Sequence, residues 1–179
     1  MKFRECGHQT PSYDLQVLQK LVKAQAQPVC LEVGSWTGYS ARAIAEVGVE
    51  RLYCIDHWKG SKNDSLKEVA EHFTAKEIQR AFCQNMGEHL LKTVIPLTGT
   101  SKFWSGLWPD SVKLNLIYID AEHDFKNAYR DIQRWFKHLA HDGTICGHDY
   151  YMPGVTQAVH DCFVNGTIKH EHNVWWWER

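Results

Sequence analysis

The chain has 179 residues, of which 44% are hydrophobic and 23% charged, a combination typical of one globular domain spanning residues 1–179. The formal net charge of −1 lacks the basic excess that nucleic-acid binding requires, so we expect no nucleic-acid partner. The first residues contain no apolar signal-peptide core, and no window approaches the roughly 20 apolar residues of a membrane span. We therefore expect a cytoplasmic protein with no membrane partner.

The beginning of the chain predicts a helix followed by a β-α-β unit. Apolar residues recur at helical spacing over Tyr13–Ala26, and Pro28 ends that pattern. The short apolar run Val29–Val33 predicts a buried parallel strand, and the Ala-rich Ser40–Val47 predicts a helix. A second strand is predicted over Arg51–Asp56, where it ends at a carboxylate.

The middle of the chain is less regular. The polar residues Trp58–Ser65 predict a loop, and Leu66–Leu91 predicts one or two helices interrupted near residues 85–87. The apolar runs Val94–Leu97 and Leu114–Asp120 predict two further strands, separated by a segment rich in Trp and Gly.

The last third of the chain returns to alternating helices and strands. Phe125–Leu139 shows a strong amphipathic pattern, and Asp142-Gly143 predicts a turn into the strand Thr144–Gly147. The remaining predicted elements are a helix over Val155–Phe163 and two strands over Ile168–His170 and Val174–Glu178. This order predicts an α/β fold: a Rossmann-like, doubly wound, mainly parallel sheet with a C-terminal antiparallel hairpin.

Cysteines and tryptophans bear on compartment and assembly. Six cysteines without a C-x-x-C pair are typical of free thiols in a reducing compartment. The run Trp175–Trp177 fits packing on both faces of a sheet or a contact between subunits, which leaves a homo-oligomer open. The cysteines are Cys6, Cys30, Cys54, Cys83, Cys146 and Cys162.

The loop after the first strand has the composition of a ligand site. Ligands of open parallel sheets bind beyond the carboxyl ends of the strands, and Gly34 and Gly38 let the backbone turn tightly there. A dinucleotide fold needs a second glycine where Trp36 stands, so this loop disfavours NAD. A purely structural strand-to-helix turn remains the alternative.

Asp56 ends the second strand at a spacing from the glycine loop that suits binding of ribose hydroxyls. Its two carboxylate oxygens match two hydroxyl donors. The alternative is an Asp that forms a turn or a helix cap.

Four motifs in this order resemble class I S-adenosylmethionine (SAM)-dependent methyltransferases. The motifs are L-E-V-G-S-W-T-G-Y-S, Y-C-I-D-H-W, L-I-Y-I-D-A-E-H-D-F and G-T-I-C-G-H-D-Y, within Val29–Phe163. They look most like the branch that includes macrocin-type sugar O-methyltransferases and bacterial relatives. The resemblance implies that SAM is the cofactor, with its ribose on Asp56 flanked by His57 and Trp58. It places the methionine portion of SAM against Glu32, Gly34, Ser35 and Gly38, with Ser40 nearby. It places the adenine beside Gly99, Thr100 and Ser101.

Asp120 and Asp149 end neighbouring strands of the predicted sheet, so we expect both carboxylates in one cleft. In the relatives such a pair binds a divalent ion, which implies Mg²⁺ or Mn²⁺ here. His148 stands where several relatives have another oxygen ligand, so it is predicted either to coordinate the metal or to act as a general base. Glu122 and His123 are further base candidates, with a helix cap together with Asp124 as the alternative.

These residues predict a methyltransferase that acts on a hydroxyl of a small molecule such as a sugar or polyol. Methylation of a nucleic-acid amino group is disfavoured because the chain lacks a D/N-P-P-Y/F motif and a basic face. Methylation of another nitrogen, or a SAM- or nucleotide-binding module without catalysis, remains the alternative, and the cleft carboxylates argue against such a module.

Overall fold

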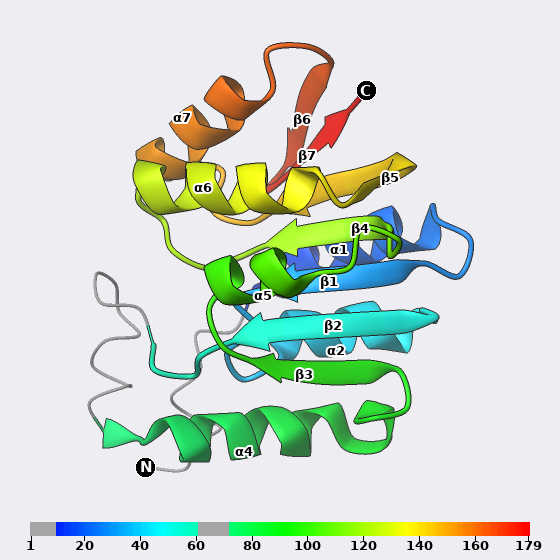
Figure 1. The fold of residues 1–179 in the computed structure, drawn as a ribbon, viewed down its shortest axis with the longest axis vertical. Coiled ribbons are helices and arrows are strands. Elements are labelled where there is room, and N and C mark those ends of the chain that lie inside the picture. The colour runs from blue at the N-terminus through cyan, green and yellow to red at the C-terminus, as the bar shows by residue number, and fades with distance from the viewer. Residues whose placement is uncertain (1–9, 61–71) are drawn as a thin grey trace.

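The computed structural model describes residues 10–60 and 72–179. Its centre is a seven-stranded sheet in the order β3-β2-β1-β4-β5-β7-β6, drawn in Figure 1 from β3 near the bottom to β6 at the top. Strands β1 to β5 run parallel, whereas β7 pairs antiparallel with both β5 and β6. The predicted mainly parallel sheet with its antiparallel hairpin is confirmed.

Buried apolar runs form the central strands. Neighbouring residues of β4 such as Leu116 and Ile117 are both fully buried, because helices cover both faces of the sheet. The strands are β1 Val29–Val33, β2 Arg51–Asp56, β3 Val94–Thr98, β4 Leu114–Ile119, β5 Leu139–Gly147, β6 Thr167–Glu171 and β7 Val174–Glu178.

The helices form two layers around this sheet. Residues of α1, α2 and α4 share one hydrophobic core, and residues of α6 and α7 share a second core on the other face. In Figure 1, α5 and α6 lie in front of the strands, and α1 and α2 lie behind them. The bounds are α1 Ser12–Lys23, α2 Tyr39–Glu46, α4 Ala75–Met86, the 3₁₀ helix η2 Gly87–His89, α5 Ser101–Leu107, α6 Phe125–Phe136 and α7 Pro153–Cys162.

Side-chain caps fix where several helices begin. Thr74 and Glu77 form a reciprocal capping box at α4. The Thr100 hydroxyl accepts a hydrogen bond from Phe103 N at α5, and the Asp124 carboxylate accepts one from Asn127 N at α6. The last two caps lie directly after the β3 and β4 regions, so they set the direction in which α5 and α6 leave the sheet.

Two sequence predictions were wrong in this region. The amphipathic pattern extended the helix to Leu139, but α6 ends at Phe136 and Leu139 already pairs with Leu114 as the first residue of β5. The predicted turn at Asp142-Gly143 lies inside β5, where the pairing register shifts. The segment described only as rich in Trp and Gly contains α5.

Other predictions lie partly outside the described residues. The loop Trp58–Ser65 and the helical stretch Leu66–Leu91 both include part of the range 61–71, and Cys6 lies in the range 1–9. The other five cysteines are free thiols. Within the described ranges, no helix is long and apolar enough to cross a membrane.

Candidate active site

The glycine loop after β1 packs directly against the end of β4. Gly34 has a φ of +93°, and a Cβ atom at this position would lie 1.9 Å from the backbone oxygen of Asp120. Only glycine fits such a close approach of two backbones. The hydrogen bonds from Gly34 N to Ile55 O (2.9 Å) and from Asp120 N to Val33 O (2.8 Å) bring the ends of β1, β2 and β4 together.

Asp56 holds two strained segments of backbone. Its Oδ2 accepts a hydrogen bond from Trp36 N at 2.7 Å, and its Oδ1 accepts one from Trp58 N at 2.6 Å. Both tryptophans have positive φ, +44° and +53°, a conformation that is uncommon for a bulky residue. Asp56 therefore anchors the glycine loop as well as facing the pocket described next. The turn at Trp58 is the alternative role that the sequence allowed for Asp56, whereas the sequence did not indicate the anchor at Trp36.

A pocket of about 440 Å³ opens at the carboxyl ends of β1 to β4. Of the residues assigned to the cofactor from the sequence, it is lined by Gly34, Asp56, His57, Gly99, Thr100 and Ser101. The other five assigned residues, which are Glu32, Ser35, Gly38, Ser40 and Trp58, are not among its lining residues. Trp58 lies beneath the loop, where its Nε1 donates to Trp36 O at 2.9 Å.

Glu32 is fully buried below the glycine loop. Neither of its carboxylate oxygens has a hydrogen-bond partner among the described residues. Burial raises the pKa of Glu32 to about 7; the nearby Ser35 and Ser40 hydroxyls oppose this shift, and the charge of Asp120 adds to it.

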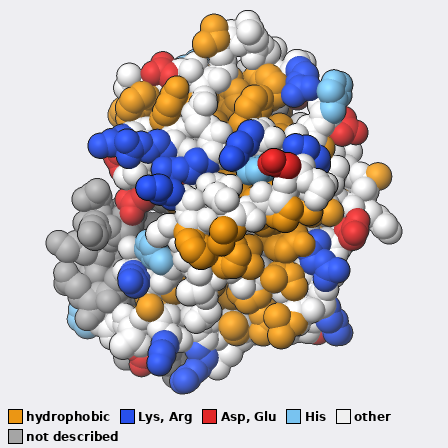
Figure 2. Space-filling model, viewed as in Figure 1, with side chains coloured by type: hydrophobic (Ala, Val, Ile, Leu, Met, Phe, Trp, Pro, Cys, Tyr) orange, Lys and Arg blue, Asp and Glu red, His pale blue; other side chains and the backbone are white. Residues whose placement is uncertain are grey.

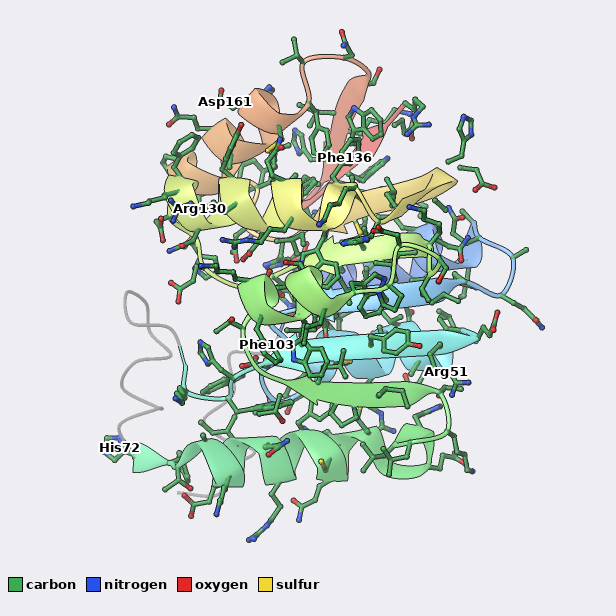
Figure 3. All side chains as sticks on the ribbon, in the orientation of Figure 1. Arg51, His72, Phe103, Arg130, Phe136 and Asp161 are labelled. Carbon is green, nitrogen blue, oxygen red and sulfur yellow. The ribbon has the colours of Figure 1, made fainter. Side chains whose placement is uncertain are left out.

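Helices α5 and α6 contribute a wall of the pocket that the sequence analysis missed. Lys102, Arg130, Asp131 and Arg134 all line it, and Arg134 pairs with Asp131 at 2.9 Å. The spacing of three and four residues on α6 is the signal that could have revealed this polar stripe. Figure 2 shows Lys and Arg side chains gathered over α6, and Figure 3 labels Arg130 among them.

Next to this pocket, Asp120, His123 and Asp149 form a compact cluster. Each offers one ligand atom, and these atoms all lie within 4.8 Å of one another. His123 Nε2 lies 2.9 Å from Asp149 Oδ2, and the hydroxyl of Tyr118 donates to Asp120 Oδ2 at 3.4 Å. Asp120 lines both the main pocket and a small cavity of about 10 Å³ that the other two residues also line. Such a volume holds about one water molecule.

His148 also lines that small cavity, but it is not among the three residues whose ligand atoms converge there, contrary to its predicted place in a metal site. Its Nε2 lies 3.2 Å from Asp14 Oδ2, and its Nδ1 lies 3.3 Å from Asp149 Oδ1. With a carboxylate at each ring nitrogen, the imidazole is stabilised as a cation whose two N–H groups face Asp14 and Asp149, so neither nitrogen is available to bind a metal. His123 takes the cleft position instead, while Asp124 alone caps α6.

The electrostatics of the cluster follow from its burial and from paired charges. Burial disfavours the His148 cation, but hydrogen bonding to Asp149 and the charges of Asp120 and Asp149 raise its pKa to about 9. Burial opposes ionisation of Asp149, yet hydrogen bonds from His123 and His148 hold its pKa well below the usual range. Burial raises the pKa of Asp120, with a further contribution from Asp149.

The strand order, the glycine loop on β1 and the carboxylate that ends β2 together define the fold of class I SAM-dependent methyltransferases. A sequence profile described as a methyltransferase domain matches residues 31–150. The chain therefore belongs to this methyltransferase family. No curated protein sequence matches it.

Solved structures agree on the fold. The chain is similar to a precorrin 8w decarboxylase from Methanobacterium thermoautotrophicum, with a TM-score of 0.72 and 12% identity over 100% of this chain and 96% of that one. It is also similar to an O-methyltransferase from Bacillus cereus in complex with SAH, with a TM-score of 0.71 and 16% identity over 98% of this chain and 86% of that one. A calicheamicin methyltransferase is similar with a TM-score of 0.68 and 11% identity over 92% of this chain and 77% of that one. At these identities the likeness shows the fold alone.

Proposed function

We propose that this chain transfers the methyl group of SAM to a hydroxyl of a small molecule. The observation that carries the proposal is the cluster of Asp120, His123 and Asp149, which adjoins the main pocket through Asp120. A hydroxyl must lose its proton as it attacks a methyl group, and the cluster places carboxylates and an imidazole where they can take or orient that proton. The names of the O-methyltransferase and calicheamicin methyltransferase neighbours are consistent with this proposal.

The pocket fits the cofactor. Its volume of about 440 Å³ lies within the range of small-molecule sites, and Gly34 of the glycine loop lines it. When bound, SAM supplies an electrophilic methyl group on a sulfonium centre. In this proposal Asp56 and His57 bind the ribose, and Gly99, Thr100 and Ser101 surround the adenine.

The cluster also fits a divalent cation. Two carboxylates and one imidazole are donors that suit Mn²⁺, and the carboxylates suit Mg²⁺. In this proposal Asp120, His123 and Asp149 would hold the ion, which would lower the pKa of a bound hydroxyl. Without an ion, Asp149 orients the His123 imidazole as the base.

Asp149→Asn is the first test of this proposal. The substitution keeps the shape of the side chain and removes a charge from the cluster, while Asp56 and the glycine loop stay intact. We expect SAM affinity within about twofold of wild type and methyl transfer lower by roughly 10²–10⁴-fold, the range for a lost acid–base group. Calorimetry with SAM, with and without Mg²⁺ or Mn²⁺, measures the first, and release of S-adenosylhomocysteine across a panel of sugars and polyols measures the second.

Asp142→Asn serves as the matched control because Asp142 is an exposed carboxylate on β5, the strand that Asp149 follows. It should behave as wild type in both assays. Full activity of Asp149→Asn would show that this carboxylate is structural, and tighter binding of NAD than of SAM would overturn the assignment of the pocket.

A further inference from the structure

Asp14 is a buried carboxylate in the first turn of α1, and nothing in the proposed reaction uses it directly. Only 1% of its surface is exposed, and it lies on the same face of α1 as the buried Val17 and Leu18. A carboxylate without compensating partners would be costly in such a place. The residues that contact the Asp14 carboxylate therefore indicate which part of the molecule it stabilises.

Both oxygens of Asp14 contact residues beside the carboxylate cluster. Oδ2 lies 3.2 Å from His148 Nε2, and Oδ1 accepts a hydrogen bond from the backbone N of Asn173 at 3.1 Å. These partners lie 134 and 159 residues further along the chain. The first turn of α1 is thus joined to the end of β5 and to the turn between β6 and β7.

The same two partners also hold Asp149. His148 Nδ1 lies 3.3 Å from Asp149 Oδ1, and Asn173 Nδ2 donates to that same oxygen at 3.1 Å. The four residues therefore form a closed ring of three hydrogen bonds and one ion pair. The ring leaves the second oxygen of Asp149, Oδ2, to face His123 at 2.9 Å.

Asp149 needs such support because its backbone has a φ of +57°. Strained conformations of this kind persist only where the surrounding structure fixes them. With two donors on Oδ1, rotation of the carboxylate would break both bonds. Its outward oxygen is thereby aimed at the cluster.

We propose that Asp14 is a positioning residue that aims the Asp149 carboxylate at His123 through His148 and Asn173. Its catalytic consequence rests on the proposed function, whereas its geometric effect does not. Residues that hold a reacting or metal-binding group in place commonly matter almost as much as the group itself.

A simpler role for Asp14 would be to anchor α1 to the fold. Other contacts of α1 already do this: Gln19 Nε2 donates to Ala43 O at 3.1 Å, Lys20 pairs with Glu171 at 3.1 Å, and Val17, Leu18 and Val22 are buried. Gln19→Ala removes one such anchor without touching the ring. It is the matched control for Asp14→Asn, whose amide can accept only one of the two hydrogen bonds.

The decisive measurement is the long-range ¹H–¹⁵N spectrum of the histidine side chains in the ligand-free protein at one pH. His123→Gln and His148→Gln assign the two imidazoles. His123 is separated from Asp14 by two intervening residues, so its signal reports transmission through the ring. We expect Asp14→Asn to shift the ring nitrogens of both His148 and His123, and Gln19→Ala to leave both as in wild type.

Two results would overturn the proposal. One is a shift of His148 with His123 unchanged in Asp14→Asn, and the other is an equal shift of His123 in Gln19→Ala. If circular dichroism shows that Asp14→Asn is unfolded, the His123 signal of Asn173→Ala tests the proposal instead. This variant removes one donor to Asp149 and leaves Asp14 in place. A shifted His123 in that variant supports the ring, and an unchanged His123 overturns it.

Activity gives a second readout. Asp14→Asn should lower kcat about 10- to 100-fold, the usual loss for such supporting residues, with SAM affinity unchanged. A wild-type kcat in an Asp14→Asn protein whose His123 signal has shifted would show that catalysis does not depend on the orientation of the Asp149 carboxylate. If no acceptor is methylated while the spectra change as expected, the proposed function fails and the positioning role stands.

Discussion

Asp56 illustrates how one side chain can serve the fold and the ligand together. Its oxygens hold the backbone N–H groups of Trp36 and Trp58, and each oxygen keeps a lone pair directed elsewhere. The sequence spacing predicted a ribose contact, and the pocket includes Asp56. The turn at Trp58 was the alternative that the sequence allowed, but the anchor at Trp36 could not be predicted, because a contact between the ends of two strands is not visible in a sequence.

These two roles can be separated by ligand choice. We expect wild-type protein to bind adenosine more tightly than 2′,3′-dideoxyadenosine by about 1–3 kcal/mol, the value of a hydrogen bond to a charged group. In Asp56→Asn this preference should shrink, because an amide offers one acceptor in place of two. Calorimetric titration measures both ligands. A preference that persists unchanged in the variant would leave Asp56 with the anchoring role alone.

The histidines and Asp14 mark the limit of residue-level prediction. The sequence placed Asp120 and Asp149 in one cleft, and their ligand atoms lie within 4.8 Å. It named both His148 and His123 as base candidates but only His148 as a metal ligand, because a ring beside a strand-end aspartate gives no indication of its direction. Asp14 precedes the buried Val17 and Leu18 by one helical turn, and that spacing was the available signal.

Among the elements, the buried strands were the most predictable. Apolar runs bounded by Gly or by polar residues gave β1, β2 and β7 with the bounds that the structure has. The junction of α6 and β5 was misplaced because Leu139 fits the helical stripe and the strand equally well. Its pairing with Leu114 decides between them, and such a partner is not part of local sequence.

The loop between β1 and α2 offers a sharp test of its contact with β4. Gly34 and Gly48 have nearly the same φ, +93° and +88°, but only Gly34 faces the Asp120 backbone, whereas a Cβ at Gly48 meets nothing within 4 Å. Both alanine variants bear the strain of a left-handed residue. We expect Gly34→Ala to be less stable than Gly48→Ala by about 1–3 kcal/mol in urea unfolding, the cost of overpacking. Equal stabilities would contradict the close approach.

For the whole molecule, the buried Glu32 predicts how stability depends on pH. In the unfolded chain this carboxyl ionises near its ordinary pKa of 4.5, whereas the folded protein keeps it protonated up to about pH 7. Between these values the folded state binds more protons at Glu32, so the contribution of this residue to stability falls as the pH rises through this window and levels off above it. The full difference is roughly 3 kcal/mol.

Urea unfolding at pH 5 and pH 8 measures this effect. Glu32→Gln should show a smaller decrease than wild type between the two pH values, with the contribution of His148 remaining because its pKa is raised to about 9. Glu50→Gln, at an exposed site, should keep the full wild-type decrease. An equal change in the free energy of unfolding between pH 5 and pH 8 for wild type and Glu32→Gln would show that Glu32 ionises normally in the folded protein.

The ring around Asp14 also has a consequence for biosynthesis. A ribosome synthesises about 5–20 residues per second, and Asn173 follows Asp14 by 159 residues. Asn173 is therefore added to the chain roughly 8 to 32 s after Asp14. The glycine loop and Asp56 emerge early, and the Asp120 backbone against which the loop packs is translated later. Asp149 acquires its second donor only when Asn173 arrives. A nascent chain that has reached Asp149 therefore lacks the second hydrogen-bond donor to this carboxylate until residue 173 has been translated.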